Sequence, residues 1–178
     1  MSMFQTLVSV VLVAQIVSPP NIDPFHLEFR IHELINAERM TQNVRPLKLD
    51  DRLADIARRH SRDMADRGFF DHINPDGKTP TERGRAGRYT CKKYLGEYIA
   101  EGLAENIFQN NLYSRVIMHG KEMTFDWNTA EKIAQSTVEG WMTSAGHRRN
   151  ILTSRYQRTG IGIIVASNDK VLITQLFC

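Results

Sequence analysis

Two apolar runs near the C-terminus constrain the fold of this chain most strongly. Residues 160–165 read Gly-Ile-Gly-Ile-Ile-Val and residues 171–177 read Val-Leu-Ile-Thr-Gln-Leu-Phe, with the turn sequence Ser-Asn-Asp-Lys between them. This pattern predicts a β-hairpin. Both strands are too apolar for one face to be exposed to water, so helices must cover both faces. The sequence therefore predicts an α+β fold, a three-layer α-β-α sandwich with a small central antiparallel sheet.

Apolar residues at helical spacing precede these strands. One helix begins at Asp23, an N-cap followed by proline, and the next is capped by Asp50 or Asp51 and ends at Gly68. His60 lies on the apolar face of the second helix, where a hydrogen-bonded core histidine is a better interpretation than a ligand. A capping box at residues 79–82 starts a short, arginine-rich helix.

The N-terminal segment has the composition of an export signal. Residues 4–17 are almost wholly apolar, the length of a signal h-region and too short to span a bilayer easily. No Lys or Arg precedes Arg30 and residues 17–20 make a poor cleavage site, so a buried arm or a misassigned start stays open. We expect residues 1–22 to be signal-like or disordered and residues 23–178 to form one domain. We also expect a secreted, periplasmic or extracellular protein with no stable transmembrane span.

The charge distribution does not indicate a nucleic-acid partner. The 178 residues carry a net charge of +3, and the basic residues form small clusters without regularly interleaved aromatic residues. Solvated helix and loop faces explain these clusters better. We therefore predict no binding to nucleic acid.

The chain has two cysteines, Cys91 and the C-terminal Cys178. An even number in an exported chain predicts one disulfide, which would tie the last strand to the segment after the arginine-rich helix. Two unpaired thiols are the alternative if the chain is cytoplasmic.

One histidine follows the last predicted helix. That helix is expected to begin at Asn128, with Glu131 at the capping-box position, and residues 144–146 break its apolar stripe. Gly146 suits a left-handed conformation past a helix end, so we expect His147 at a chain reversal. A structural histidine and a site residue are equally good interpretations of this pattern.

Two further residues lie in similar settings. His72 follows Phe69 and Phe70 at the edge of a turn sequence, Asn-Pro-Asp-Gly. Glu105 lies within a short predicted strand over residues 102–108, where a partly desolvated carboxylate needs a cationic or metal partner.

These motifs occur together in a fixed order that resembles the bacterial branch of the CAP superfamily, the cysteine-rich secretory, antigen 5 and pathogenesis-related 1 proteins (SCP domain). The motifs are Phe69-Phe70-x-His72-x-x-Pro75-Asp76-Gly77, Glu105-Asn106-Ile107, Trp141-Met142-x-Ser144-x-Gly146-His147-Arg148-x-Asn150-Ile151-Leu152 and Gly160-Ile161-Gly162. The resemblance runs from about residue 28 to the C-terminus. It implies an α-β-α sandwich, secretion, and a cleft with two histidines and acidic residues that holds a divalent metal in some members.

Carried over by position, His72 and His147 are the expected metal ligands, with zinc the metal that suits two imidazoles. Glu105 is the acidic cleft residue, and Ser144 stands where the eukaryotic pattern has a second glutamate. His72, Glu105 and His147 are also the candidates for catalysis, and no nucleophile stands out, since no glycine-flanked turn presents Ser144. We expect the two imidazole rings to converge with Glu105 across one cleft.

The segment at residues 109–127 is longer than the bacterial norm and follows no regular period. It is expected to be a loop, either a flap over the cleft or a segment that completes the core. His119 in this loop is the candidate for a third metal ligand and a cleft-lining residue.

The resemblance implies a site without naming a reaction. The favoured hypothesis is an exported domain whose cleft binds a divalent metal and a small-molecule or lipid ligand, or a cell-envelope component. A metal-dependent hydrolase acting on a peptide or the cell envelope is the second hypothesis, and a structural or adhesive extracellular module is the third.

Overall fold

A four-stranded sheet forms the centre of the computed structural model, which describes residues 18–178. Its strand order is β1-β7-β8-β4, with bounds Lys48–Leu49, Arg158–Val165, Lys170–Phe177 and Ala104–Asn111. The predicted hairpin is confirmed as β7 and β8, and β4 pairs antiparallel with β8 along its whole length. The short β1 is parallel to β7, so the sheet is antiparallel except at this edge.

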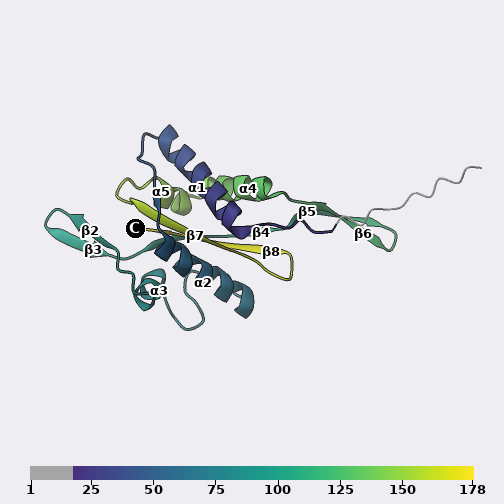
Figure 1. The fold of residues 1–178 in the computed structure, drawn as a ribbon, viewed down its shortest axis with the longest axis horizontal. Coiled ribbons are helices and arrows are strands. Elements are labelled where there is room, and N and C mark those ends of the chain that lie inside the picture. The colour runs from purple at the N-terminus through teal and green to yellow at the C-terminus, as the bar shows by residue number, and fades with distance from the viewer. Residues whose placement is uncertain (1–17) are drawn as a thin grey trace, which may run out of the picture.

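Five helices cover the two faces of the sheet in the described part of the chain, which confirms the predicted sandwich (Figure 1). One layer contains α1 (Pro24–Thr41), α4 (Ala130–Thr143) and α5 (Ala145–Leu152). The other contains α2 (Asp51–Arg67) and α3 (Pro80–Ala86). The sheet is therefore buried on both sides, as its apolar strands require.

Strand β8 shows how the two layers divide the core. Its residues Val171, Ile173 and Phe177 pack in the cluster that contains α1, α4 and α5. The alternate residues Leu172 and Leu176 pack in the clusters that contain α2. Because successive side chains of a strand point to opposite faces, one continuous apolar run supplies both cores.

Two glycines of β7 allow α2 to approach the sheet closely. A Cβ atom on Gly160 would lie 2.1 Å from the backbone nitrogen of Ala54, and one on Gly162 would lie 2.0 Å from that of Arg58. Any larger residue would therefore push the helix away from the strand. This contact explains the glycine-isoleucine-glycine motif at residues 160–162.

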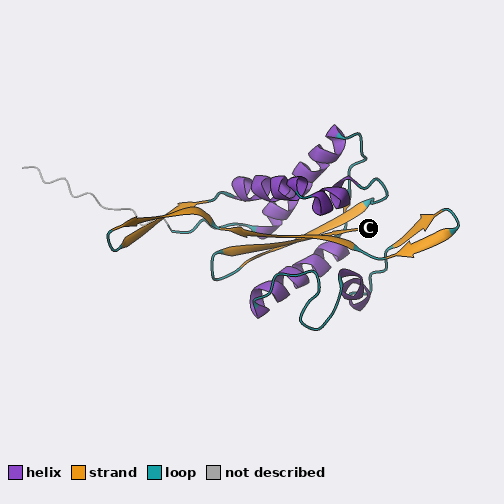
Figure 2. Ribbon diagram, turned by 180° about the vertical axis from the view of Figure 1, so that it is seen from behind, coloured by secondary structure: helices purple, strands orange, loops and turns teal. Residues whose placement is uncertain are grey.

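Two hairpins extend from opposite ends of the central sheet (Figure 2). One consists of β2 (Lys92–Leu95) and β3 (Tyr98–Glu101), and the other of β5 (Tyr113–His119) and β6 (Glu122–Trp127). The expectation of an irregular loop over residues 109–127 is therefore wrong. A turn with Gly120 in the left-handed region (φ 64°) joins β5 to β6, and aromatic contacts between the two strands replace a regular apolar alternation.

Two local expectations around α4 are also wrong. The N-cap is Thr129, whose side chain accepts a hydrogen bond from the Lys132 backbone, while the Asn128 side chain donates to the Asn111 carbonyl instead. Glu131 forms an ion pair with Arg30 of α1 rather than a capping box. The competing partners come from other elements, which local sequence signals do not include.

The cysteines form the predicted disulfide, Cys91–Cys178, with their Cα atoms 5.6 Å apart. It joins the end of the sheet to the segment that precedes β2. The predicted export signal at residues 4–17 lies outside the described residues. No helix among residues 18–178 is both long and apolar enough to cross a membrane.

Candidate functional site

The candidate site lies at the start of β4, where three elements meet the edge of the sheet. Glu105 is the second residue of β4, an edge strand paired on one side with β8. His72 lies in the loop between α2 and α3, and His147 lies in the first turn of α5. The structure therefore brings together segments that are far apart in the sequence.

Glu105 is held by two cationic groups. The residue is only 6% exposed, and its Oε2 accepts a hydrogen bond from the Arg83 guanidinium at 2.5 Å. Its Oε1 accepts from Nδ1 of His72 at 2.8 Å. A buried carboxylate needs such partners because it has lost its hydration. The predicted need for a cationic partner is met here by an arginine.

Sequence reasoning missed Arg83 as a site residue. The predicted capping box is confirmed, with Thr79 and Glu82 bonded to each other's backbone N–H, and it starts α3 so that Arg83 faces β4. Arg83 also donates at 2.8 Å to the carbonyls of His72 and Lys78, which fixes the loop that carries His72. The arginine-rich composition of this helix was the available signal.

His72 is oriented by Glu105 and remains open to solvent. Its side chain is 45% exposed, and the hydrogen bond from Nδ1 to Glu105 raises the pKa of the imidazole above its usual value. Its Nε2 has no hydrogen-bond partner in the part of the chain that the structure describes. A carboxylate that holds one ring nitrogen and leaves the other free is a common arrangement around metal-binding histidines.

His147 reaches the same place from the opposite layer. Its carbonyl accepts from the Asn106 side chain at 3.2 Å, and the Asn150 side chain donates to the Glu105 carbonyl at 3.2 Å and to Asn106 at 2.9 Å. These bonds attach α5 to β4. Burial lowers the pKa of His147, and the neighbouring charge of His72 lowers it further. The predicted spacing of the two rings remains a prediction.

The local geometry around His147 differs from the expected chain reversal. Ser144 ends α4 in an extended conformation, and Gly146 is a helical residue of α5 rather than a left-handed one. The break between the helices is therefore at Ser144. Its side chain makes no capping bond, so its hydroxyl is left near the start of the helix that carries His147.

His119 does not join these residues. It is the last residue of β5, next to the turn of a hairpin that begins beyond Asn111. Asn111 ends β4, and six residues of strand separate it from Glu105 by roughly 20 Å. The hairpin points away from this end of the sheet (Figure 1), so neither a third ligand nor a flap over the cleft comes from it.

His60 is a core histidine, as predicted. It is 1% exposed, its Nε2 donates to the Asp71 carbonyl at 3.0 Å, and the same nitrogen lies 3.8 Å from Oε1 of Glu105. Burial lowers its pKa. Only one of its two nitrogens is satisfied, since Nδ1 has no hydrogen-bond partner.

The only uncommitted metal-ligating side chains described at the site are the imidazoles of His72 and His147. Within residues 18–178, no group of three His, Cys, Asp or Glu side chains is arranged to hold a metal ion. Both Glu105 oxygens are already bonded, so this carboxylate orients His72 instead of serving as a third ligand. Water would have to complete the coordination, whereas catalytic zinc sites usually have three protein ligands.

The model of the cysteine-rich secretory protein family, CAP, matches residues 32–177. The chain belongs to this family. The uncharacterized protein YkwD of Bacillus subtilis (strain 168) is 31% identical over 137 residues, which are 77% of this chain and 42% of the relative. The uncharacterized membrane protein YlbC of the same organism is 27% identical over 152 residues, 84% of this chain and 34% of the relative. The chain thus spans less than half of either curated relative.

Solved structures show the same fold. An extracellular protein containing an SCP domain from Bacillus anthracis str. Ames has a TM-score of 0.61 and 25% identity, covering 86% of this chain and 40% of that one. An outer surface protein from Borrelia burgdorferi has a TM-score of 0.64 and 17% identity, covering 90% of this chain and 97% of that one. The bacterial CAP-family identification from the motifs is therefore confirmed.

Proposed function

We propose that this CAP domain is exported and that its cleft at the start of β4 binds a divalent metal, zinc in the first place, through His72 and His147. The observation that supports this most directly is the Nδ1–Oε1 hydrogen bond of 2.8 Å between His72 and Glu105. It leaves Nε2 of a half-exposed imidazole free beside a second histidine. The names of the extracellular and outer-surface structural neighbours support export.

Each residue at the site has a separate task in this proposal. Glu105 fixes the ring of His72 and makes it a better metal ligand, and the hydrogen bond from Arg83 holds that carboxylate in place. His147 supplies the second nitrogen from α5, whose position depends on Asn106 and Asn150. A bound zinc ion would supply Lewis acidity and anchor an oxygen or nitrogen atom of a small ligand.

Calorimetric titration of the full chain with zinc chloride tests this function. The wild-type protein should bind one zinc ion, and the His72→Ala/His147→Ala double variant should lose at least about tenfold in affinity. His119→Ala is the matched control, because it removes an exposed histidine outside the cleft. Equal affinity in all three proteins would refute the proposal.

The hydrolase hypothesis has less support than the binding hypothesis. A third protein ligand would favour it, and the candidate, His119, lies at the far end of the β5–β6 hairpin. Ser144 joins α4 to α5 without a strand-to-helix nucleophile turn around it. Binding without catalysis is therefore the function that the geometry supports best, and a lipidic ligand or a cell-envelope component remains a prediction.

A further inference from the structure

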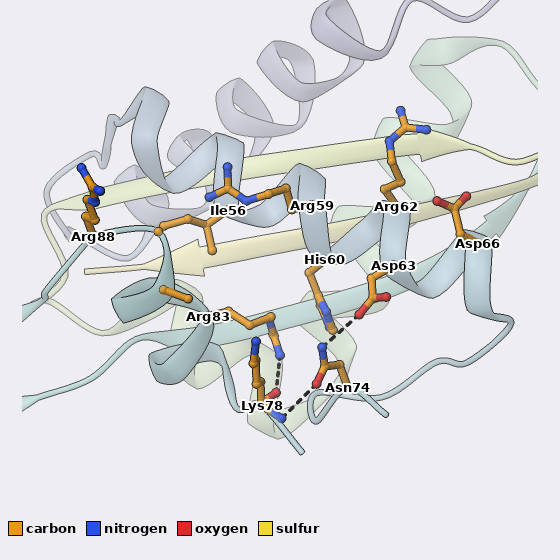
Figure 3. A pocket seen from close by; sticks show the side chains of 12 residues that line it. Ile56, Arg59, His60, Arg62, Asp63, Asp66, Asn74, Lys78, Arg83 and Arg88 are labelled. Carbon is orange, nitrogen blue, oxygen red and sulfur yellow. Dashed lines mark hydrogen bonds between the residues drawn. The ribbon is translucent and has the colours of Figure 1, made fainter. Parts of the chain in front are cut away.

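A cavity lies on the outer side of α2. It has a volume of about 660 Å³, is open to solvent, and is lined by residues of α2, of α3, of the loop between them and of the turn after α3 (Figure 3). This volume is in the range of small-molecule sites. His72, Glu105 and His147 do not line it, although Arg83 and His60 in its wall lie beside Glu105.

Basic side chains dominate the wall of this cavity. Five cations and two carboxylates line it, namely Arg59, Arg62, Lys78, Arg83, Arg88, Asp63 and Asp66. Arg83 is paired with Glu105, whereas the other four cations make no ion pair with any described residue. Asp63 is engaged by Arg67 and by the Asn74 side chain. The cavity therefore has an excess of unpaired positive charge, which favours an anionic ligand.

Two residues that line the cavity each have a buried polar atom without a partner. Nε of Arg83 has none, although the Arg83 side chain is only 9% exposed and its other two nitrogens are bonded. Nδ1 of His60 also has none, and that side chain is fully buried. Figure 3 shows the two side chains converging from α3 and α2. Leaving such atoms unsatisfied costs about 1–3 kcal/mol each, so a ligand that supplies both an acceptor and a donor would be stabilised here.

A phosphate group matches this combination of charge and hydrogen bonding. Its oxygens accept from the N–H of Arg83 and from the surrounding arginines, and guanidinium groups pair well with phosphate. The monoanion of a phosphate monoester, whose second pKa is about 6, also has a P–OH, which can donate to the unprotonated Nδ1 of His60. A carboxylate in its ionised form would satisfy Arg83 but has no proton to offer the histidine.

The remaining space indicates what the phosphate is attached to. The cavity is larger than a phosphate group, and Asp66 lies at the end away from Arg88 (Figure 3). Asp63 and Asp66 would repel an anion but accept hydrogen bonds from hydroxyl groups. We propose that this cavity binds a small phosphate monoester with a hydroxylated body, such as a polyol or sugar phosphate, independently of any metal in the cleft.

Titration of the full chain with glycerol 3-phosphate tests this proposal. We expect saturable binding of one molecule per chain with a Kd of about 1 mM or tighter, and no binding of glycerol at the same concentrations. Inorganic phosphate should compete, and weaker binding of glycerol 3-phosphate than of phosphate would overturn the role of the hydroxylated body.

Two double variants distinguish binding in the cavity from nonspecific electrostatic attraction. Arg59→Gln/Arg88→Gln alters exposed cavity residues and should weaken binding at least about tenfold while the protein stays folded. Arg85→Gln/Lys92→Gln removes the same charge from exposed residues that do not line the cavity and should bind normally. Equal weakening in both double variants, or no saturable binding by the wild-type chain, would overturn the proposal. Zinc binding by the Arg59/Arg88 variant should be unchanged.

Discussion

His60 and His72 lie near the same carboxylate oxygen, yet their environments shift their protonation in opposite directions. Nε2 of His60 is 3.8 Å from Oε1 of Glu105, and Nδ1 of His72 is 2.8 Å from it. His60 is fully buried, and the loss of hydration lowers its pKa. His72 is 45% exposed, and its hydrogen bond to Glu105 raises its pKa. Glu105 thus lies between a buried histidine, His60, that belongs to the core and a half-exposed histidine, His72, that a ligand can reach.

The largest effect on stability is expected from removing Arg83, which forms an ion pair with the buried carboxylate of Glu105. Arg83→Ala leaves a carboxylate that is 1% exposed without its strongest partner, and this should cost about 3–5 kcal/mol of unfolding free energy. Urea denaturation measures the loss. Arg85→Ala, on the same helix, removes an ion pair with Glu101 in which the arginine is 58% exposed, and should cost less than about 1 kcal/mol. Similar losses of unfolding free energy in the two variants would contradict the view that only the buried ion pair of Arg83 is important for stability.

Replacing His60 or His72 with alanine compares the contributions of the two histidines to stability. His60→Ala removes a buried ring that packs against Phe69 at 5.8 Å between centroids and donates to the Asp71 carbonyl, at a cost of about 2–3 kcal/mol. His72→Ala should cost less than about 1 kcal/mol, because the ring is half-exposed. Thermal and urea unfolding measure both changes. If His72→Ala destabilises the protein as much as His60→Ala, His72 has a structural role as well.

The two histidines should also respond to pH with opposite signs. Because the pKa of His72 is raised above 6.5, its contribution to stability is complete below pH 6.5 and is lost as pH rises through the folded-state pKa. Because the pKa of His60 is lowered, the unfolded chain takes up the proton first, and stability falls as pH drops below 6.5. NMR titration should find His72 above this value and His60 below it. Glu105→Gln should bring His72 back toward 6.5, and an unchanged His72 pKa would contradict the role of Glu105.

The sequence predicted the structure correctly where the local pattern of residues agrees with the packing in the folded protein. The apolar run of β8 predicted a sheet buried on both faces because its alternate residues supply two cores. The settings of His72 and Glu105, together with the resemblance to the family, predicted a shared site, and these residues are in contact. The partner of Glu105 was missed because Arg83 comes from a helix 22 residues earlier and looks like any solvated arginine there.

The β5–β6 hairpin was misinterpreted for a different physical reason. Its residues are mostly exposed on both faces, so no core imposes an alternation, and its strands are recognisable only through contacts with each other. Capping residues such as Thr129 were misplaced by one position because the neighbouring Asn128 binds another element. The missing core therefore explains the error at the hairpin, and a partner in another element explains the error at the cap.

The smallest effect is expected from shortening this hairpin. Replacing residues 118–123 with a two-residue Asn-Gly turn removes exposed side chains, keeps the Ile117–Thr124 pair next to the turn, and should change the unfolding free energy by less than about 1 kcal/mol. Zinc affinity should not change, because the hairpin lies at the other end of β4 from Glu105. Calorimetry on the shortened chain checks both expectations. A loss of zinc affinity would show that the hairpin belongs to the site.

The central claim is that Glu105 holds His72 with Nδ1 protonated so that Nε2, together with His147, receives the metal. Long-range ¹H–¹⁵N NMR of the full chain with and without zinc tests this most directly, because it reports each ring nitrogen separately. The account predicts Nδ1–H for neutral His72, and zinc-induced shifts at the ring nitrogens of His72 and His147 but not of His60. Zinc-induced shifts confined to other histidines, or a proton on Nε2 of neutral His72, would contradict it.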